Sequence, residues 1–106
     1  MSLAAEYNQI VDDQAPDWSN LFFELSIPDE SKLDEARLLL APVQLERIPG
    51  ERHRFSFRVS SGQGYGVYAP LAAASLAKLD DRNISGVLTL ERSLRAGRHN
   101  LTQGPA

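Results

Sequence analysis

The chain has 106 residues, no cysteine, 42% hydrophobic and 24% charged residues and a formal net charge of −3. This length and composition fit one globular domain with its own core, and the lack of cysteine excludes disulfides, thiolate metal sites and cysteine nucleophiles. No apolar run approaches the roughly eighteen residues of a membrane span, and the first basic residue is Lys32, so the start lacks the features of a signal or transit peptide. We therefore expect a cytoplasmic protein without membrane contact.

The N-terminal residues predict a short helix and then a strand. Residues 4–13 place apolar side chains at helical spacing, but chain ends often fray, so a helix and an irregular start both stay open. Residues 18–27 alternate apolar and polar side chains, which is typical of a half-buried strand, although a helix over "WSNLFFEL" is an alternative. The inward side chains of this strand would be Leu21, Phe23, Leu25 and Ile27.

The next segment predicts a helix and a hairpin. The helix opens at Pro28 and ends before Pro42, and Ser31 with Asp34 resembles a capping box. Residues 43–48 predict a short strand, and Pro49 and Gly50 a turn. Residues 52–60 form the second arm of the hairpin, with Phe55, Phe57 and Val59 facing inward and Arg54, Ser56 and Arg58 facing outward.

The C-terminal half predicts a loop, a helix, a strand and a tail. An alanine-rich helix runs from Pro70 to Asp80, and residues 84–91 form the last strand. We expect residues 1–17 to be an N-terminal segment, residues 18–92 a single α+β domain and residues 93–106 a flexible polar tail.

The order strand, helix, strand, strand, helix, strand predicts a ferredoxin-like βαββαβ sandwich. In this α+β fold a four-stranded antiparallel sheet carries both helices on one face, and the third strand lies between the first and the second. The predicted core consists of Phe23, Leu25, Leu33, Leu40, Phe55, Phe57, Val59, Leu76, Leu88 and Leu90.

A glycine-rich loop follows the third predicted strand. "SSGQGYG" contains Gly62, Gly64 and Gly66, and a loop between a strand and a helix can hold phosphate on converging backbone N–H groups. The G-x-G-x-G spacing matches neither the dinucleotide fingerprint nor a Walker loop, and the helix that begins at Pro70 lies four residues beyond the last glycine. We favour a connecting loop with positive φ angles over a phosphate site.

Two tyrosines and one arginine complete the candidate binding site. Tyr65 and Tyr68 flank the last glycine, and aromatic side chains on loops often anchor protein partners. Arg58 could supply the counter-charge if the loop binds an anion instead. The alternative for the tyrosines is packing against the helix and the sheet edge.

The charges divide between the two halves of the chain. Residues 1–50 carry a net charge of −7 and residues 51–106 a net charge of +4. Arginines 52, 54 and 58 would share the open face of the sheet, where nucleic acid could bind. We favour cross-strand pairing of Arg54 and Arg58 with Glu24, Gln44 and Glu46, because an RNA-binding sheet needs stacking aromatics in place of these arginines. No nucleic-acid partner is expected.

Catalytic groups are sparse in the sequence. His53 and His99 are the only histidines, and neither stands in a spacing that predicts a catalytic triad or a metal site. We therefore expect no enzymatic activity, no cofactor and no metal. The preferred hypothesis is a small protein-interaction or assembly domain, bound to a protein partner or to itself as a homo-oligomer through the loop, the sheet face or a strand edge. The alternative is a small-ligand or nucleotide-sensing domain that uses the backbone of residues 61–66.

Overall fold

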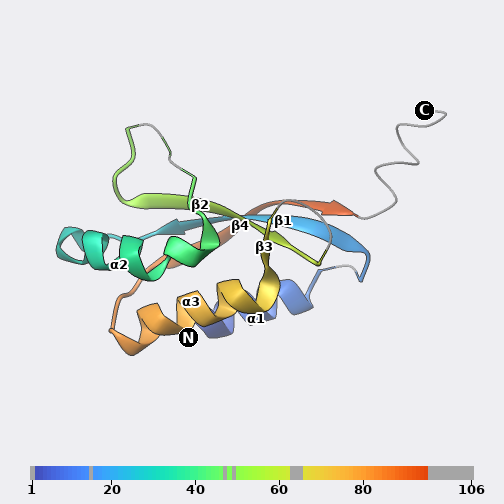
Figure 1. Ribbon diagram of the computed structural model, residues 1–106, viewed down its shortest axis with the longest axis horizontal. Helices are drawn as coiled ribbons and strands as arrows, with labels where there is room; N and C mark the ends of the chain where they lie inside the picture. The colour runs from blue at the N-terminus through green and yellow to red at the C-terminus, as the bar shows by residue number, and fades with distance from the viewer. Residues whose placement is uncertain (1, 15, 47, 49, 63–65, 96–106) are drawn as a thin grey trace.

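The fold is α+β, as predicted, with a four-stranded sheet and three α-helices on one of its faces (Figure 1). The computed structural model describes residues 2–14, 16–46, 48, 50–62 and 66–95. Its elements in chain order are α1 (Leu3–Asp12), β1 (Trp18–Ser26), the 3-10 turn η1 (Glu30–Lys32), α2 (Leu33–Leu39), the 3-10 turn η2 (Ala41–Val43), β2 (Arg54–Ser60), β3 (Val67–Tyr68), α3 (Ala69–Asp81) and β4 (Val87–Arg95).

The sheet has the order β3-β2-β1-β4 and is mixed. β1 lies in the middle and pairs antiparallel with β2 and β4, whereas β3 runs parallel to β2. The predicted sheet was wholly antiparallel. The observed sheet differs from the ferredoxin-like arrangement in both its strand order and its parallel pair. The inward-facing residues of β1 and β2 lie side by side as predicted, in the pairs Leu21↔Val59, Phe23↔Phe57 and Leu25↔Phe55.

The prediction of a strand over residues 43–48 is wrong. Val43 ends η2 with its side chain buried, and Gln44 takes a left-handed conformation with φ 53°, which breaks an extended path. Among the described residues of this segment, only Glu46 pairs with the sheet, where its N–H donates to the Ser56 carbonyl at 2.7 Å in an isolated bridge. At the end of β2, Val59 and Ser60 pair with the two residues of β3, which the sequence had assigned to a loop.

The predicted helix boundaries need correction in the second helix. In place of one helix, residues 30–43 form η1, α2 and η2 in succession. The Asp29 carboxylate accepts the N–H of Ser31 at 3.0 Å and caps η1. No side-chain cap precedes α2, so the predicted capping box of Ser31 and Asp34 is absent at this helix start. The alanine-rich helix is present and extends one residue beyond the prediction at each end.

The last strand lies further along the chain than predicted. It starts at Val87 and continues to Arg95, so residues 93–95, assigned to the tail, pair with β1. Ile84 is buried but precedes the strand. The register between β1 and β4 shifts between Phe22 and Phe23, where Glu91 forms a β-bulge.

α1 is part of the core, which settles the alternative that the sequence left open. Its Leu3 and Tyr7 are buried, and both Asp80 carboxylate oxygens accept hydrogen bonds from its first N–H groups, those of Leu3 at 2.9 Å and Ala4 at 3.0 Å. At the other end of α3, the Tyr7 hydroxyl donates to the Ala69 carbonyl at 2.9 Å. Burial raises the pKa of Tyr7. The two helices are therefore antiparallel, and α1 is hydrogen-bonded to both ends of α3 (Figure 1).

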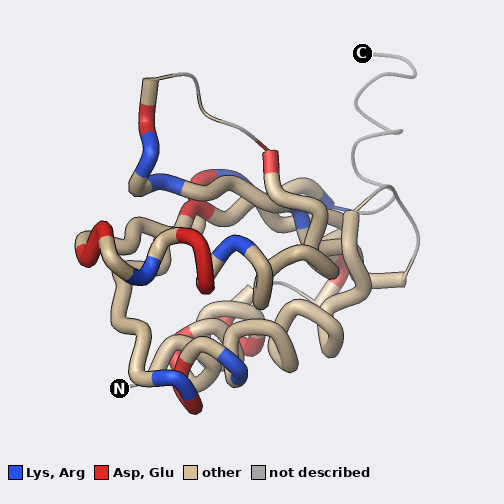
Figure 2. The backbone as a smooth tube through the Cα atoms, turned by 60° about the vertical axis from the view of Figure 1, so that its left-hand side comes forward, with Lys and Arg blue, Asp and Glu red and all other residues tan. Residues whose placement is uncertain are grey.

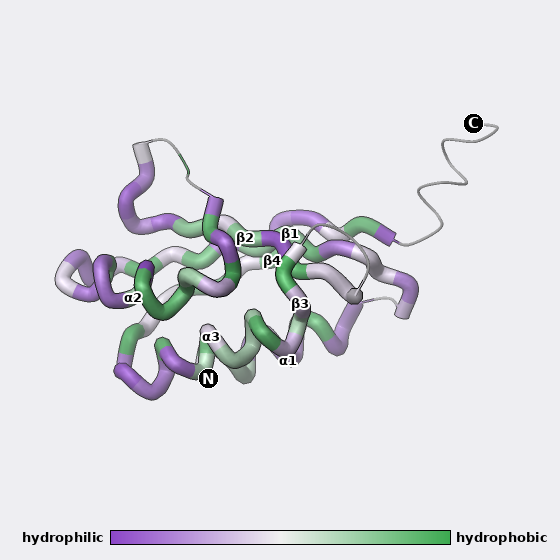
Figure 3. The backbone as a smooth tube through the Cα atoms, in the orientation of Figure 1, coloured by the Kyte–Doolittle hydropathy of each residue, from purple (hydrophilic) through white to green (hydrophobic). Residues whose placement is uncertain are grey.

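The core contains the residues that the sequence predicted. All ten are buried except Leu90, which is partly buried and packs against the others. At its centre the Phe23 ring lies 5.2 Å from Tyr7 and 5.4 Å from Phe57, centroid to centroid. Figure 3 shows the alternation of apolar and polar residues along the strands that directs these rings inward. None of the helices in the described parts of the chain has the length and apolar character needed to cross a bilayer.

Ion pairs connect the acidic half of the chain with the basic half. Among the described residues three pairs do so: Arg52–Glu30 at 2.7 Å, Arg82–Glu35 at 2.6 Å and Arg54–Glu24. Figure 2 shows basic and acidic segments close together around α2 and the loop before β2. The charge asymmetry along the sequence is thus balanced within the fold, at least at these three places.

Candidate functional site

Backbone conformation explains one glycine of the predicted binding loop, and close packing explains another. Gly62 has a φ of +127°, which other residues rarely adopt, and its N–H donates to Ser60 Oγ at 3.2 Å. Gly66 lies against the backbone of β2, so that an added Cβ would stand 2.8 Å from the Arg58 carbonyl oxygen and 2.9 Å from Ser60 N. Both observations support the interpretation as a connecting loop. Gly64 and Tyr65 lie outside the described residues.

The start of α3 offers few groups to an anion. The helix begins at Ala69, three residues after Gly66, and no side chain caps it. Pro70 lies in its first turn and has no N–H to donate. A phosphate bound at this end would therefore lose one of the backbone donors that such sites use.

Tyr68 lies at the edge of the open face of the sheet. It pairs with Ser60, and its neighbour Val67, which pairs with Val59, is partly buried against the core. Since successive side chains of a strand point to opposite faces, Tyr68 points away from the core, and it is 61% exposed. Tyr68 is the N-cap residue of α3 but makes no side-chain cap hydrogen bond, so the alternative that its side chain folds back to cap the helix is wrong.

Arg58, Phe22 and Arg92 form a cluster on the open face, which we call the Phe22 cluster. The register places Phe22 directly between Arg58 of β2 and Arg92 of β4. The guanidinium carbons of Arg92 and Arg58 lie 4.2 and 5.6 Å from the centroid of the Phe22 ring. These are cation–π distances, each worth about 0.5–1 kcal/mol at an exposed site. Within the described residues Arg92 has no carboxylate partner.

The sequence did not reveal the part of Arg92 in this cluster. A regular strand would place Glu91 opposite Phe22, because Leu90 pairs with Phe23. The bulge at Glu91 shifts the register by one residue and brings an arginine to that position instead. The predicted strand also ended at Glu91, and no residue type nearby signals a bulge.

The remaining arginines of the predicted face are neutralised or lie elsewhere. Arg54 donates from Nε to the Glu24 carboxylate and from Nη1 to Glu51 Oε1 at 3.4 Å, which confirms the expected pairing with Glu24. The predicted pairing placed Arg58 against Glu24, whereas in the structure Arg58 lies opposite Phe22. The prediction that Arg52 shares this face is wrong, because Arg52 lies in the loop before β2 and pairs with Glu30.

The pKa of Glu24 is lowered, first by the hydrogen bond from Arg54 and then by its charge. A lowered folded-state pKa means that the pair contributes stability above the unfolded-state pKa and loses it as the pH falls through the folded-state value. We expect Arg54→Gln to raise the pKa of Glu24 towards its ordinary value, measured by carboxyl carbon NMR titration. An Arg52→Gln control should leave that pKa unchanged, and equal shifts in both variants would contradict the pairing.

The described residues form no group that could hold a metal ion. His53 is structural: its Nδ1 lies 2.9 Å from the Ile27 carbonyl oxygen, and its own carbonyl accepts the Ile27 N–H at 2.8 Å. No group of three histidine, aspartate or glutamate side chains converges in the described part of the chain. The Phe22 cluster, with Tyr68 at the same face, is therefore the candidate functional site.

Comparison of the chain with protein-family models, with curated protein sequences and with solved structures found no match.

Proposed function

We propose that the chain is a non-catalytic protein-interaction domain that binds an acidic segment of a partner protein on the open face of its sheet. The observation that carries this proposal is the Phe22 cluster, in which an aromatic ring lies between two arginines on a face without helices (Figure 1). Arginine and aromatic side chains dominate the binding energy of protein interfaces. Tyr68 and Val87, 61% and 64% exposed, extend the contact area towards both edges of the sheet.

The geometry favours a protein partner over nucleic acid. A single-stranded nucleic acid needs aromatic faces on which its bases can stack, and the Phe22 ring already has Arg92 at 4.2 Å. Arg54 is neutralised by Glu24 and Glu51, which leaves few cations on this face to release counterions from a phosphate backbone.

The sheet face is also a better candidate than the outer edge of β4. A long edge strand can pair with a second copy of the chain, and β4 runs over nine residues. However, the bulge at Glu91 and the charged Arg92 and Arg95 are devices that discourage pairing at an edge. We therefore place the partner on the face.

Binding of an acidic peptide tests the proposal. We would measure fluorescence anisotropy of a labelled twelve-residue peptide of alternating glutamate and tyrosine, at roughly 0.15 M salt. Arg92→Gln should weaken binding about fivefold, as expected for an exposed charge pair of about 1 kcal/mol. Tyr68→Ala should weaken binding with nearly unchanged thermal stability. Arg37→Gln is the matched control, because it removes the same charge from α2, and it should bind like the wild type.

Three outcomes would contradict the proposal. Equal loss in Arg92→Gln and Arg37→Gln would show a general charge effect without a site. If a peptide with glutamine in place of glutamate binds equally well, the partner need not be acidic. Single-stranded DNA that binds more tightly than the peptide, with an affinity that collapses as salt rises, would make the face a nucleic-acid site.

A further inference from the structure

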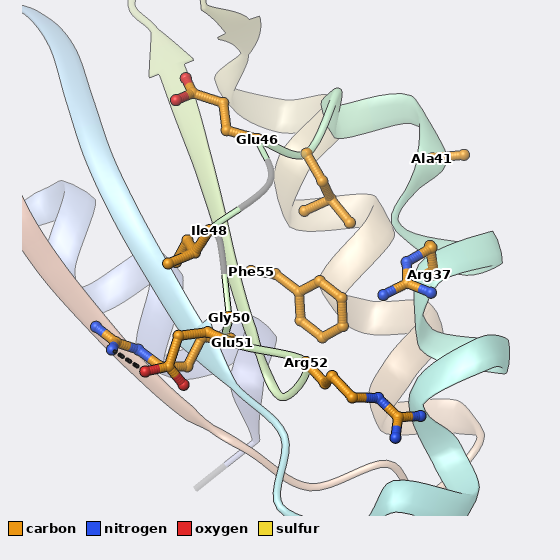
Figure 4. A pocket seen from close by; sticks show the side chains of 10 residues that line it. Arg37, Ala41, Glu46, Ile48, Gly50, Glu51, Arg52 and Phe55 are labelled. Atoms are coloured by element: carbon orange, nitrogen blue, oxygen red, sulfur yellow. Dashed lines mark hydrogen bonds and ion pairs between the residues drawn. The ribbon is translucent and has the colours of Figure 1, made fainter.

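A pocket of about 800 Å³ lies between α2 and the outer edge of β2 (Figure 4). It is separate from the Phe22 cluster, because neither Phe22 nor the two arginines beside it, Arg58 and Arg92, line the pocket. Its size is within the range of small-molecule sites, about 300–1,000 Å³.

The pocket combines an apolar wall with one approaching cation. Leu45, Ile48 and Phe55 supply the apolar surface, with the Phe55 ring in the middle of the view in Figure 4. Arg37 approaches the ring from α2, and its guanidinium carbon lies 5.5 Å from the ring centroid. A ligand that contacts both groups would need an apolar body and a charged end.

The ion pairs around the pocket show which arginine can receive a ligand. Arg52 is held by Glu30 at 2.7 Å, and Arg54 is held by Glu24 and Glu51. Arg37 reaches Asp34 only at 3.9 Å, whereas Arg52 and Glu30, although 73% and 61% exposed, are in direct contact at 2.7 Å. Among the three arginines of the pocket, Arg37 is thus the one that an anion could bind with the least loss of an existing ion pair.

We propose that this pocket binds a small monoanion with an apolar body, of the class of aliphatic or aromatic carboxylates. The carboxylate pairs with the Arg37 guanidinium, and the apolar body lies on Leu45, Ile48 and Phe55. Glu46 and Glu51 at the rim would repel ligands with further negative charges, which favours a monoanion over a di- or triphosphate. This inference is independent of the peptide site on the sheet.

The test compares octanoate with 1-octanol, which has the same chain length but no charge. We would titrate the isotope-labelled full chain with each compound and follow amide and side-chain NMR shifts. Octanoate should bind at least about tenfold more tightly than octanol and shift signals of Arg37, Ile48 and Phe55. Arg37→Gln should remove most of this tenfold preference and leave octanol binding unchanged. Ile48→Ala should weaken both compounds.

Arg92→Gln is the matched control, because it removes one arginine charge from the other face and should keep the preference for octanoate. Equal affinities of octanoate and octanol for the wild type would overturn the proposal. So would an Arg37→Gln variant with unchanged preference, or equal losses in the Arg37 and Arg92 variants. Since Arg92→Gln weakens the acidic peptide and spares octanoate, failure of one proposal is distinguishable from failure of the other.

Discussion

Phe23→Ala is expected to lower the free energy of unfolding by about 3–5 kcal/mol, the usual cost of removing a buried aromatic ring. Phe23 is 0% exposed and contacts the Tyr7 and Phe57 rings, so the variant leaves a cavity between α1 and the two central strands. Neither neighbour can move in without giving up its own packing. Urea unfolding followed by circular dichroism measures the loss.

The neighbouring residue supplies the matched control for this prediction. Phe22 has the same side chain in the same strand, but it lies on the open face beneath two arginines. Phe22→Ala should cost only about 1–2 kcal/mol, since it removes two exposed cation–π contacts and no core contact. If Phe22→Ala destabilises the chain more than Phe23→Ala, the side chains of β1 point to the opposite faces.

Alternation explains why the central strands could be predicted from the sequence. The period of two in residues 18–27 and 52–60 leaves one arrangement that buries the alternating apolar side chains and puts Phe22 on the open face, and the observed pairs Phe23↔Phe57 and Leu25↔Phe55 follow it. The alanine-rich helix was equally clear, because its apolar spacing and Pro70 agree on the same start.

Short-range patterns failed where long-range packing decides the structure. Residues 43–48 alternate like a strand, yet burial of Val43 in η2 and the left-handed Gln44 turn the chain away from the sheet. β3 has only two residues, too few for a recognisable pattern. Ser2 caps α1 locally, but the N–H groups of Leu3 and Ala4 donate to Asp80, a residue 77 positions beyond Leu3.

The candidate site was predictable only in part for the same reason. The outward direction of Arg58 follows from its strand, and the exposure of Tyr68 was one of two open alternatives. The partner residues could not be found, because the contact of Arg92 with Phe22 depends on a bulge. The pocket beside α2 is lined by residues 45, 46, 48 and 50–52, which the predicted hairpin had placed in a strand and a turn.

Gly66→Ala is expected to destabilise the fold by about 1–3 kcal/mol, the usual cost of overpacking. The added Cβ would lie 2.8 Å from the Arg58 carbonyl oxygen and 2.8 Å from the Val59 carbonyl carbon. These are backbone atoms of a paired strand, which cannot turn aside as a flexible side chain can. β3 would have to move from β2, and the Val59↔Val67 pairing would weaken. Denaturant unfolding and amide hydrogen exchange at Val67 and Tyr68 measure both effects.

Gly62→Ala separates this steric effect from backbone strain. Gly62 has a φ of +127° and open space around its Cβ position, so alanine there is disfavoured by conformation alone. It should lower the overall stability and leave β3 paired with β2. Gly66→Ala should instead increase hydrogen exchange at β3 more than elsewhere, because the clash is at that strand. Unchanged exchange at Val67 in Gly66→Ala, with wild-type stability, would show that the loop does not return as closely to β2 as the structure has it.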